Sequence, residues 1–243
     1  MKTKNYLLLF FTLLMFSACK KDPKTVPVKF TSTTYQELNS FDNTGKPANL
    51  LKDTISPSML QFIDTTLPDG VNLTTTHPEL FSSSAIADIA ITQPSDVYIT
   101  FVTEDGGSKN SIAFYTYPTN KPPTNAKDIQ LITYVFPNAG SQTPLRPGDK
   151  AKLGNFTAGT SIGFVLMQDA WNSTTGSLNN DAVHFCSNDA LNPEVDPNLK
   201  KHAVLINYAP ENKILVGFED LDRTNGGCDN DFNDVVFYAT VTH

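Results

Sequence analysis

Short β-prone runs separated by turn-forming residues are the feature that most constrains the fold of this chain. The runs are rich in Val, Ile, Phe, Tyr and Thr, which favour strands. Turn signals stand between them, among them Asp-Gly-Gly at residues 105–107 and Asn-Gly-Gly at 225–227. The pattern predicts strands over residues 85–91, 96–103, 111–117, 129–136, 161–168, 202–208, 213–219 and 234–242.

The run at residues 96–103 indicates how such strands pack. Val97, Ile99 and Phe101 fall on one face, while Val102 shares the other face with more polar side chains. Because both faces are partly apolar, the strands suit two packed sheets better than a parallel sheet covered by helices. We therefore expect a mainly β fold, an antiparallel β-sandwich of jelly-roll-like form.

A short helix is expected directly before these strands. Ser56 is a favourable N-cap, Pro57 suits the first helical position, and Met59 and Ile63 are spaced four residues apart. We expect one or two such short helices beside the sandwich. Residues 56–243 are assigned to a single β-sandwich domain.

The N-terminus resembles a bacterial export signal. Lys2 and Lys4 precede an uncharged, mostly apolar stretch over residues 6–16. That stretch is too short to cross roughly 30 Å of hydrocarbon as a helix, which needs about 20 residues. Phe-Ser-Ala-Cys at residues 16–19 resembles the lipobox of bacterial lipoproteins. We expect residues 1–18 to be a lipoprotein signal peptide and Cys19 to carry the lipid; an ordinary secretory signal is the alternative.

Cleavage after residue 18 would change the net charge of the protein. Two of the 18 basic residues lie in the signal, so 16 basic and 25 acidic residues are left, a net charge of −9. This negative charge disfavours nucleic acid as a partner. Residues 19–55 are rich in Lys, Thr, Pro, Asn and Ser and lack a regular apolar pattern, so we expect a flexible tether there.

The cysteines are then few enough to suggest a disulfide. The chain has three cysteines, and with Cys19 lipidated only Cys186 and Cys228 are left. Outside the cytoplasm a bridge between these two is plausible, but two separately buried thiols fit the sequence equally well.

The most informative segment is an acidic connection near the C-terminus. Two predicted strands flank residues 219–234, which are too many for a tight hairpin. Crowded carboxylates repel one another unless a positive charge joins them. The carboxylates of this connection are those of Glu219, Asp220, Asp222, Asp229, Asp231 and Asp234, and Asn233 adds an amide oxygen among them.

A bound Ca²⁺ would offset the repulsion between these carboxylates. Ca²⁺ takes six to eight oxygen ligands, and Asp229, Asp231 and Asn233 supply oxygens at alternate positions. The spacing imitates the start of an EF-hand, but Asp234 stands where its glycine should be and Thr240 where its glutamate should be. The alternative is that these residues form turns without a metal, in which their side chains accept hydrogen bonds from backbone amides of a solvated loop.

These residues also carry a family resemblance. Gly-Phe-Glu-Asp-Leu at residues 217–221, followed by Asp-Asn-Asp-Phe-Asn-Asp-Val-Val-Phe at 229–237, resembles the closing signature of the domain-of-unknown-function family numbered 4114. LruC-type domains have a similar ending. Upstream segments extend the resemblance over about residues 86–241. It implies an exported β-rich domain with no assigned activity and a suspected cation site at Glu219, Asp220, Asp229, Asp231 and Asp234.

Other features are weaker. The acidic turn at residues 104–110 could reach the same metal, although an ordinary hairpin turn is the better explanation. Trp171, the only tryptophan, follows a predicted strand and could stack on a flat ligand such as a sugar, or it could anchor a loop. We find no phosphate-binding loop, nucleophile elbow or other catalytic constellation, so no enzymatic activity is expected.

Together these features predict a lipid-anchored protein of the outer membrane, on the cell surface or the periplasmic face. Its domain is expected to be a calcium-stabilised module that binds or adheres to a glycan, a matrix component or a protein. A purely structural or envelope-assembly lipoprotein is the alternative, and a glycan hydrolase with a carboxylate pair is the third reading.

Overall fold

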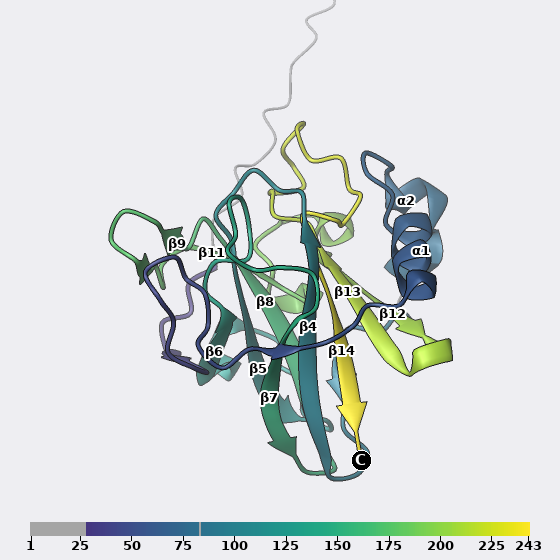
Figure 1. Cartoon of the computed structure of the whole chain (residues 1–243). Helices are drawn as coiled ribbons and strands as arrows, with labels where there is room; N and C mark the ends of the chain where they lie inside the picture. The colour runs from purple at the N-terminus through teal and green to yellow at the C-terminus, as the bar shows by residue number, and fades with distance from the viewer. Residues whose placement is uncertain (1–27, 83) are drawn as a thin grey trace, which may run out of the picture.

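The computed structural model describes residues 28–82 and 84–243, and these residues form a mainly β structure. Two sheets face each other as a sandwich (Figure 1), so the predicted fold class is confirmed. The expected signal peptide, the expected lipid-bearing Cys19 and the first part of the expected tether lie outside the described residues.

The first sheet consists of β1 (Thr34–Glu37), β3 (Ile89–Ala90), β5 (Ser111–Pro118), β6 (Leu131–Phe136), β8 (Thr160–Gln168) and β11 (Val183–Cys186). The second consists of β2 (Leu51–Lys52), β4 (Ser95–Glu104), β7 (Asp149–Phe156), β12 (Ala203–Tyr208), β13 (Lys213–Phe218) and β14 (Val235–Thr242). Their orders are β1-β6-β5-β8-β11, with β3 beside β8, and β12-β13-β14-β4-β7-β2. Between described strands of these sheets, only β1 and β6 pair in parallel.

The main core lies between the two sheets. Val97, Ile99 and Phe101 point into it from β4, as their alternation predicted. Phe164 of β8 and Phe237 of β14 meet edge to face across the core, with ring centroids 5.0 Å apart. Apolar burial between the sheets is therefore the dominant force that joins them.

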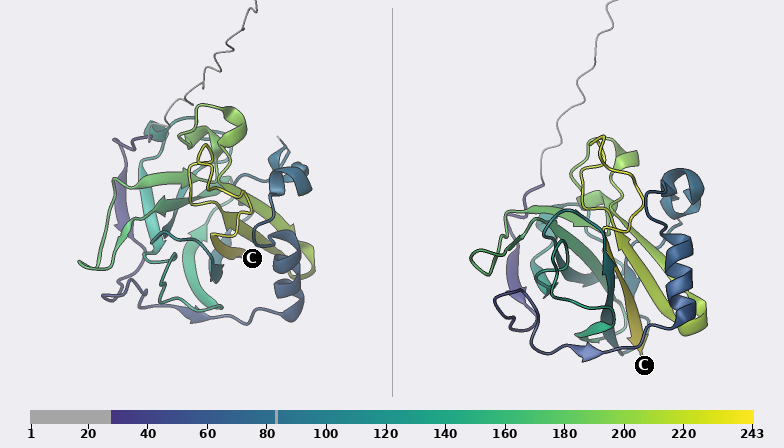
Figure 2. Two further views of the ribbon diagram at one scale, coloured as in Figure 1. Left: turned by 90° about the horizontal axis from the view of Figure 1, so that it is seen from above. Right: turned by 45° about the horizontal axis from the view of Figure 1, so that its top comes forward.

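The outer face of the second sheet is covered by the predicted helix, α1 (Pro57–Thr66), followed by the shorter α2 (Leu73–Thr76) (Figure 2). Ser56 caps α1 by accepting a hydrogen bond from the Met59 amide at 3.1 Å. Met59 and Ile63 pack with Val102 of β4. Both the helix and the partly apolar outer face of β4 are thus confirmed.

Short connections complete the described chain. A small hairpin joins β9 (Trp171–Asn172) to β10 (Ser177–Leu178). No helix in the described ranges has both the length and the apolar character needed to cross a membrane. The 3-10 turns are η1 (Pro78–Phe81), η2 (Ala126–Asp128), η3 (Asp189–Leu191), η4 (Pro197–Leu199) and η5 (Ala209–Glu211).

The expected tether is wrong for residues 28–55. β1 pairs with β6 in register Thr34 to Leu131, and β2 pairs with β7. Phe30 is buried against the outer face of the first sheet. These strands expose most of their side chains, so backbone pairing rather than an apolar pattern holds them, and the sequence gives little sign of it.

β7 was also not predicted. Its sequence alternates Lys150 and Lys152 with Ala151 and Leu153, and only the latter two enter the core. A strand with two lysines and a glycine lacks the β-branched and aromatic content that marked the others. Its backbone pairing with β4 holds this segment as a strand, although its composition does not favour one.

The outer face of the first sheet holds a buried histidine. His184 of β11 stacks on Phe30, with ring centroids 4.4 Å apart. Its Nδ1–H donates to the Ala182 carbonyl at 2.7 Å, which leaves Nε2 to accept from the Tyr35 hydroxyl at 2.8 Å. Burial lowers the pKa of His184 to about 4 because the site disfavours the charged ring.

This burial predicts a pH dependence of stability. Between pH 6.5 and about 4 the unfolded chain binds a proton at His184 that the folded chain does not, so stability falls as the pH falls. The loss should approach roughly 3 kcal/mol and stop below pH 4. The free energy of unfolding, measured by urea titration across this range, checks it. His184→Phe keeps a ring against Phe30 without a titrating group, and an unchanged pH profile in that variant would contradict the assignment.

Candidate metal centre

The acidic loop, residues 219–234, begins and ends at the same point of the fold. Phe218 of β13 pairs with Val235 of β14, so the loop leaves and re-enters adjacent strands. It is the yellow-green loop at the upper end of the sandwich in Figure 1. Asn230 and Phe232 adopt left-handed backbone conformations, with φ of 63° and 59°. These turns fold the loop back over the strand ends.

Three carboxylates converge in this loop. Glu219, Asp229 and Asp231 each place one oxygen so that all three lie within 4.8 Å of one another. Two oxygens that share a Ca²⁺ ion at about 2.4 Å lie no more than about 4.8 Å apart, so these separations are compatible with a common ion. Glu219 and Asp231 are buried, whereas Asp229 is exposed, so the cluster opens to solvent on one side.

Hydrogen bonds hold the two buried carboxylates in place. Glu219 accepts from the Phe232 amide at 2.9 Å and from the Cys228 thiol at 2.9 Å. Asp231 accepts from the Gly70 amide at 2.8 Å, which ties the loop to the turn between α1 and α2. The cluster is therefore positioned by the acidic loop itself and by the turn at Gly70.

The electrostatics of the cluster oppose ionisation. Burial raises the pKa of Glu219 and of Asp231, and neighbouring carboxylates, Asp229 among them, raise both further. Among the described residues no lysine, arginine or histidine nitrogen lies within 4.0 Å of these oxygens. A bound cation would supply the missing positive charge.

Asp220 and Asp234 form a separate pair. The Asp220 amide donates to Asp234 Oδ2 at 2.7 Å, and Asn110 Nδ2 donates to Asp220 Oδ2 at 2.7 Å. Burial, followed by the charge of Asp220, raises the pKa of Asp234 to about 8. The turn at residues 104–110 thus reaches the acidic loop, but at this pair: a Cβ on Gly106 would lie 2.6 Å from Asp220 Oδ2.

The six predicted ligands are therefore divided. The structure brings together Glu219, Asp229 and Asp231, and it places Asp220 and Asp234 beside them as a second group. Asn233 lines a neighbouring groove with Glu104, and its backbone amide donates to Asp231 Oδ1 at 3.1 Å.

Sequence reasoning missed Arg223, whose side chain is buried inside the acidic loop. Its Nε donates to Asn230 Oδ1 at 2.7 Å and its Nη1 donates to the Lys201 carbonyl at 3.1 Å. The guanidinium lies over the rings of Phe81 and Phe232, at 5.6 and 5.5 Å from their centroids. Its place as a lone cation among acids was the one available signal. It stabilises the loop through these contacts, and no carboxylate of the described residues lies within 4.0 Å of its nitrogens.

The two cysteines do not form the suggested bridge. Cys186 is a free thiol buried on the outer face of the first sheet, and Cys228 is a free thiol in the acidic loop. Burial and the Glu219 carboxylate raise the pKa of Cys228. The alternative of two separate thiols is the one that the structure shows, because the side chains belong to different packing environments.

The suggested ligand-stacking role of Trp171 is also wrong. The side chain is 3% exposed, and its ring meets Phe41 edge to face at 5.7 Å. A Cβ on Gly45 would lie 3.1 Å from the indole. The indole therefore anchors the segment that contains Phe41 and Gly45, which the sequence had assigned to the tether.

The part of the chain that contains the acidic loop matches a known protein family. Residues 156–242 match the family model of a domain of unknown function, DUF4114. The resemblance read from the closing motif is thereby confirmed for this segment, which contains the whole acidic loop. The DUF4114 match begins at residue 156, so it does not extend to the upstream segments from residue 86. Neither the curated proteins nor the solved structures compared with the chain give a match.

The glycine of the closing motif has a packing reason. A Cβ on Gly217 of β13 would lie 2.2 Å from the Phe232 carbonyl oxygen and 2.7 Å from Leu67 Cδ1. The acidic loop thus crosses directly over β13, and Phe232 enters the cluster that contains Leu67. A side chain at residue 217 would lift the loop and the carboxylates with it.

We predict that Gly217→Ala destabilises the protein by roughly 1–3 kcal/mol through overpacking. Gly226→Ala is a matched control in the same loop, because a Cβ there meets nothing within 4 Å, and its change should stay within about 0.5 kcal/mol. Urea unfolding of the three proteins measures both values. Equal stabilities for the two variants would show that the loop does not pack on β13 as described.

Proposed function

We propose that the protein is a lipid-anchored, calcium-stabilised surface module for binding or adhesion. The observation that carries the proposal is the convergence of Glu219, Asp229 and Asp231, with no cationic nitrogen of the described residues within 4.0 Å of these carboxylates. An oxygen-only ligand set favours a hard cation, and calcium is the common one outside the cytoplasm. Extracellular calcium modules work with dissociation constants of about 10⁻⁴ to 10⁻³ M, so even a modest site would be filled there.

A calcium ion in this cluster would act as a staple. Glu219 follows β13, Asp229 and Asp231 belong to the returning chain, and Asp231 also holds the Gly70 amide. One ion would therefore join the end of the hairpin to the turn beside α2. The upper rim of the sandwich would become a rigid surface, which suits a module that presents loops to a ligand.

We predict that calcium raises the melting temperature of the soluble domain and that a chelator reverses the effect. A ligand that binds only the folded state adds about 2.7 kcal/mol at a hundredfold excess over its dissociation constant. Asp231→Asn should abolish most of the calcium response. Glu37→Gln, which removes one exposed carboxylate on β1, is the control and should keep it.

Identical melting curves with calcium and with chelator would rule out the metal part of the proposal. The binding part is tested separately, with calcium-loaded protein on arrays of glycans and matrix proteins. If the protein binds calcium but no array component, the purely structural role gains support.

The proposed lipid anchor makes its own prediction. Cys19→Ser should remove the acylation site, so the full chain should lose its lipid and leave the membrane fraction. Mass spectrometry of the N-terminal peptide and detergent partition measure this. A Cys186→Ser variant is the control and should stay membrane-bound. Retention of the Cys19→Ser protein in the membrane would contradict lipid anchoring.

A further inference from the structure

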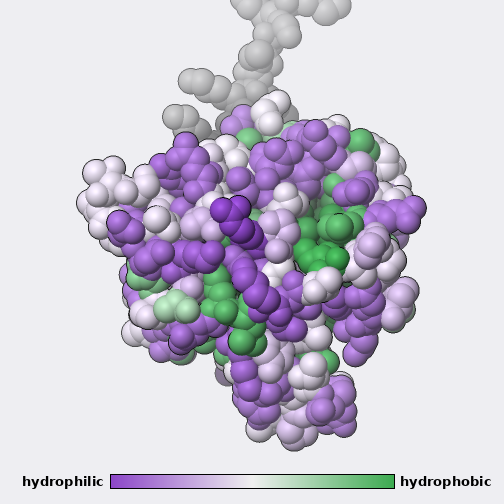
Figure 3. Space-filling model, in the orientation of Figure 1, coloured by the Kyte–Doolittle hydropathy of each residue, from purple (hydrophilic) through white to green (hydrophobic). Residues whose placement is uncertain are grey.

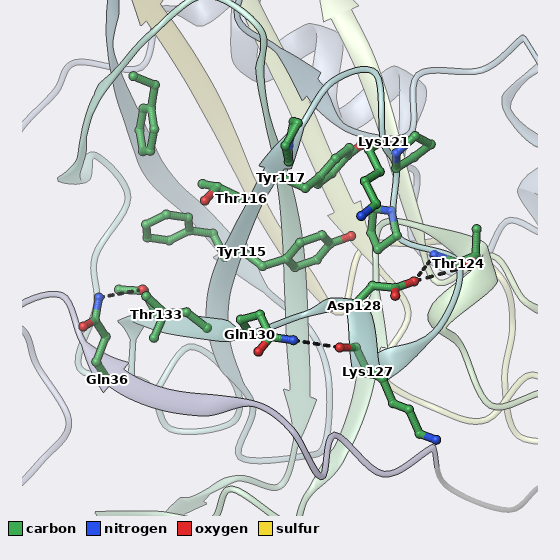
Figure 4. Close-up of a pocket in the computed structure, with 16 residues that line it drawn as sticks. Gln36, Tyr115, Thr116, Tyr117, Lys121, Thr124, Lys127, Asp128, Gln130 and Thr133 are labelled. Carbon is green, nitrogen blue, oxygen red and sulfur yellow. Dashed lines mark hydrogen bonds between the residues drawn. The ribbon is translucent and has the colours of Figure 1, made fainter.

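A groove of about 930 Å³ lies in the first sheet, where β5 and β6 separate (Figure 4). β5 pairs with β6 only from Ile112 to Phe114. Beyond this point β5 continues to Pro118 paired with β8, and β6 begins at Leu131 paired with β1; no other described strand pairs with either of these ends. The gap between the two strand ends forms the floor of the groove.

The backbone of β5 faces this groove. Residues in an antiparallel strand direct their N–H and C=O groups alternately to the two neighbouring strands. The Asn110 carbonyl accepts from Ala139, which follows β6, so the even-numbered residues face that side. Thr116 therefore points its N–H and C=O into the groove, and Figure 4 shows its side chain on the opposite side of β5 from Tyr115 and Tyr117.

The backbone of β6 alternates in the same way. The carbonyls of Gln130 and Tyr134 accept from amides of the β1 segment, so Leu131 directs its backbone groups the other way, toward β5. Thr116 and Leu131 would be the next pair of the ladder, but the ladder ends before them. Each strand therefore presents a free edge to the groove, the arrangement that an added strand uses.

The rim of the groove is positively charged. Lys121 and Lys127 line it, are exposed, and have no carboxylate within 4.0 Å among the described residues. Asp128 is the one carboxylate among the described residues that line the groove. It accepts from the Thr124 and Asn125 amides at 2.9 and 3.1 Å as part of the cap of η2. On a chain with a net charge of −7, this rim favours an acidic partner.

The wall of the groove is already in place. The Thr119 amide donates to Gly159 at 2.8 Å, and Asn188 Nδ2 donates to the Pro123 carbonyl at 2.9 Å. These bonds hold the loop between β5 and β6 against β8 and the segment after β11. A ligand would therefore meet a formed site and would not have to order this loop.

We propose that this groove takes an extended acidic segment of another protein, which adds as a strand to the free edge of β5. Backbone groups at strand spacing favour a polypeptide over a saccharide, and the two lysines select its charge. The inference names a partner class for the proposed binding role and so rests on that role, but it does not depend on calcium. β5 runs from beside Asn110, which contacts Asp220, to Pro118 in the groove, so the two sites lie at opposite ends of this strand.

The test uses a labelled synthetic peptide of alternating valine and threonine with a glutamate at each end, and fluorescence anisotropy to measure its affinity. Lys121→Gln with Lys127→Gln should weaken binding by roughly three- to tenfold. Lys109→Gln with Lys152→Gln changes the net charge equally outside the groove and should leave the affinity unchanged. A peptide with lysine ends should bind more weakly than the glutamate peptide to the unmodified protein.

A second readout separates strand addition from charge attraction. Bound peptide should slow hydrogen exchange of the Thr116 amide, and N-methylation of alternate peptide amides should abolish binding in one register. The proposal is overturned if the peptide does not bind, or if it binds without slowing exchange of the Thr116 amide. It is also overturned if oligogalacturonate displaces the peptide and no amide of the groove is protected. Because each measurement is made with calcium and with chelator, such a result would leave the calcium test and the array test of the proposed function intact.

Discussion

Repulsion among Glu219, Asp229 and Asp231 is the constraint on which the upper end of this fold depends. Three carboxylate oxygens lie within 4.8 Å of one another, and in the part of the chain that the structure describes no cationic nitrogen lies within 4.0 Å of them. The amides of Phe232 and Gly70 offset part of the charge, and they also fix the loop over β13 and against the turn beside α2. Below them Phe232 is fully buried, so apolar packing brings the carboxylates together even though their charges oppose it. A cation is the group that would reconcile these two forces.

The sequence predicts the parts of the fold that are set by local patterns. The alternation at Val97, Ile99 and Phe101 identified the core face of β4, and Ser56 with Pro57 marked the start of α1. The loop between β13 and β14 was located because a long acidic connection between two strong strands is unusual. Each of these signals lies within a few residues, where propensity and periodicity decide the outcome.

Features set by distant contacts were not accessible in this way. β1 depends on an edge of β6 almost a hundred residues away, and Trp171 is buried by a segment that looked like a linker. Glu219 and Asp220 are adjacent in sequence, but they follow directly after a strand, where successive side chains point to opposite sides. That alternation could have divided the predicted ligands into the two observed groups. Whether Cys186 and Cys228 form a bridge depends on where each side chain packs in the fold, and their spacing in the sequence does not reveal this.

Diffraction data from calcium-soaked crystals, collected where calcium scatters anomalously, test the central claim most directly. We predict an anomalous peak about 2.3 to 2.6 Å from oxygens of Glu219, Asp229 and Asp231, with the Gly70 turn still in contact with Asp231. An empty cluster at millimolar calcium, with the three side chains turned away from one another, would contradict it.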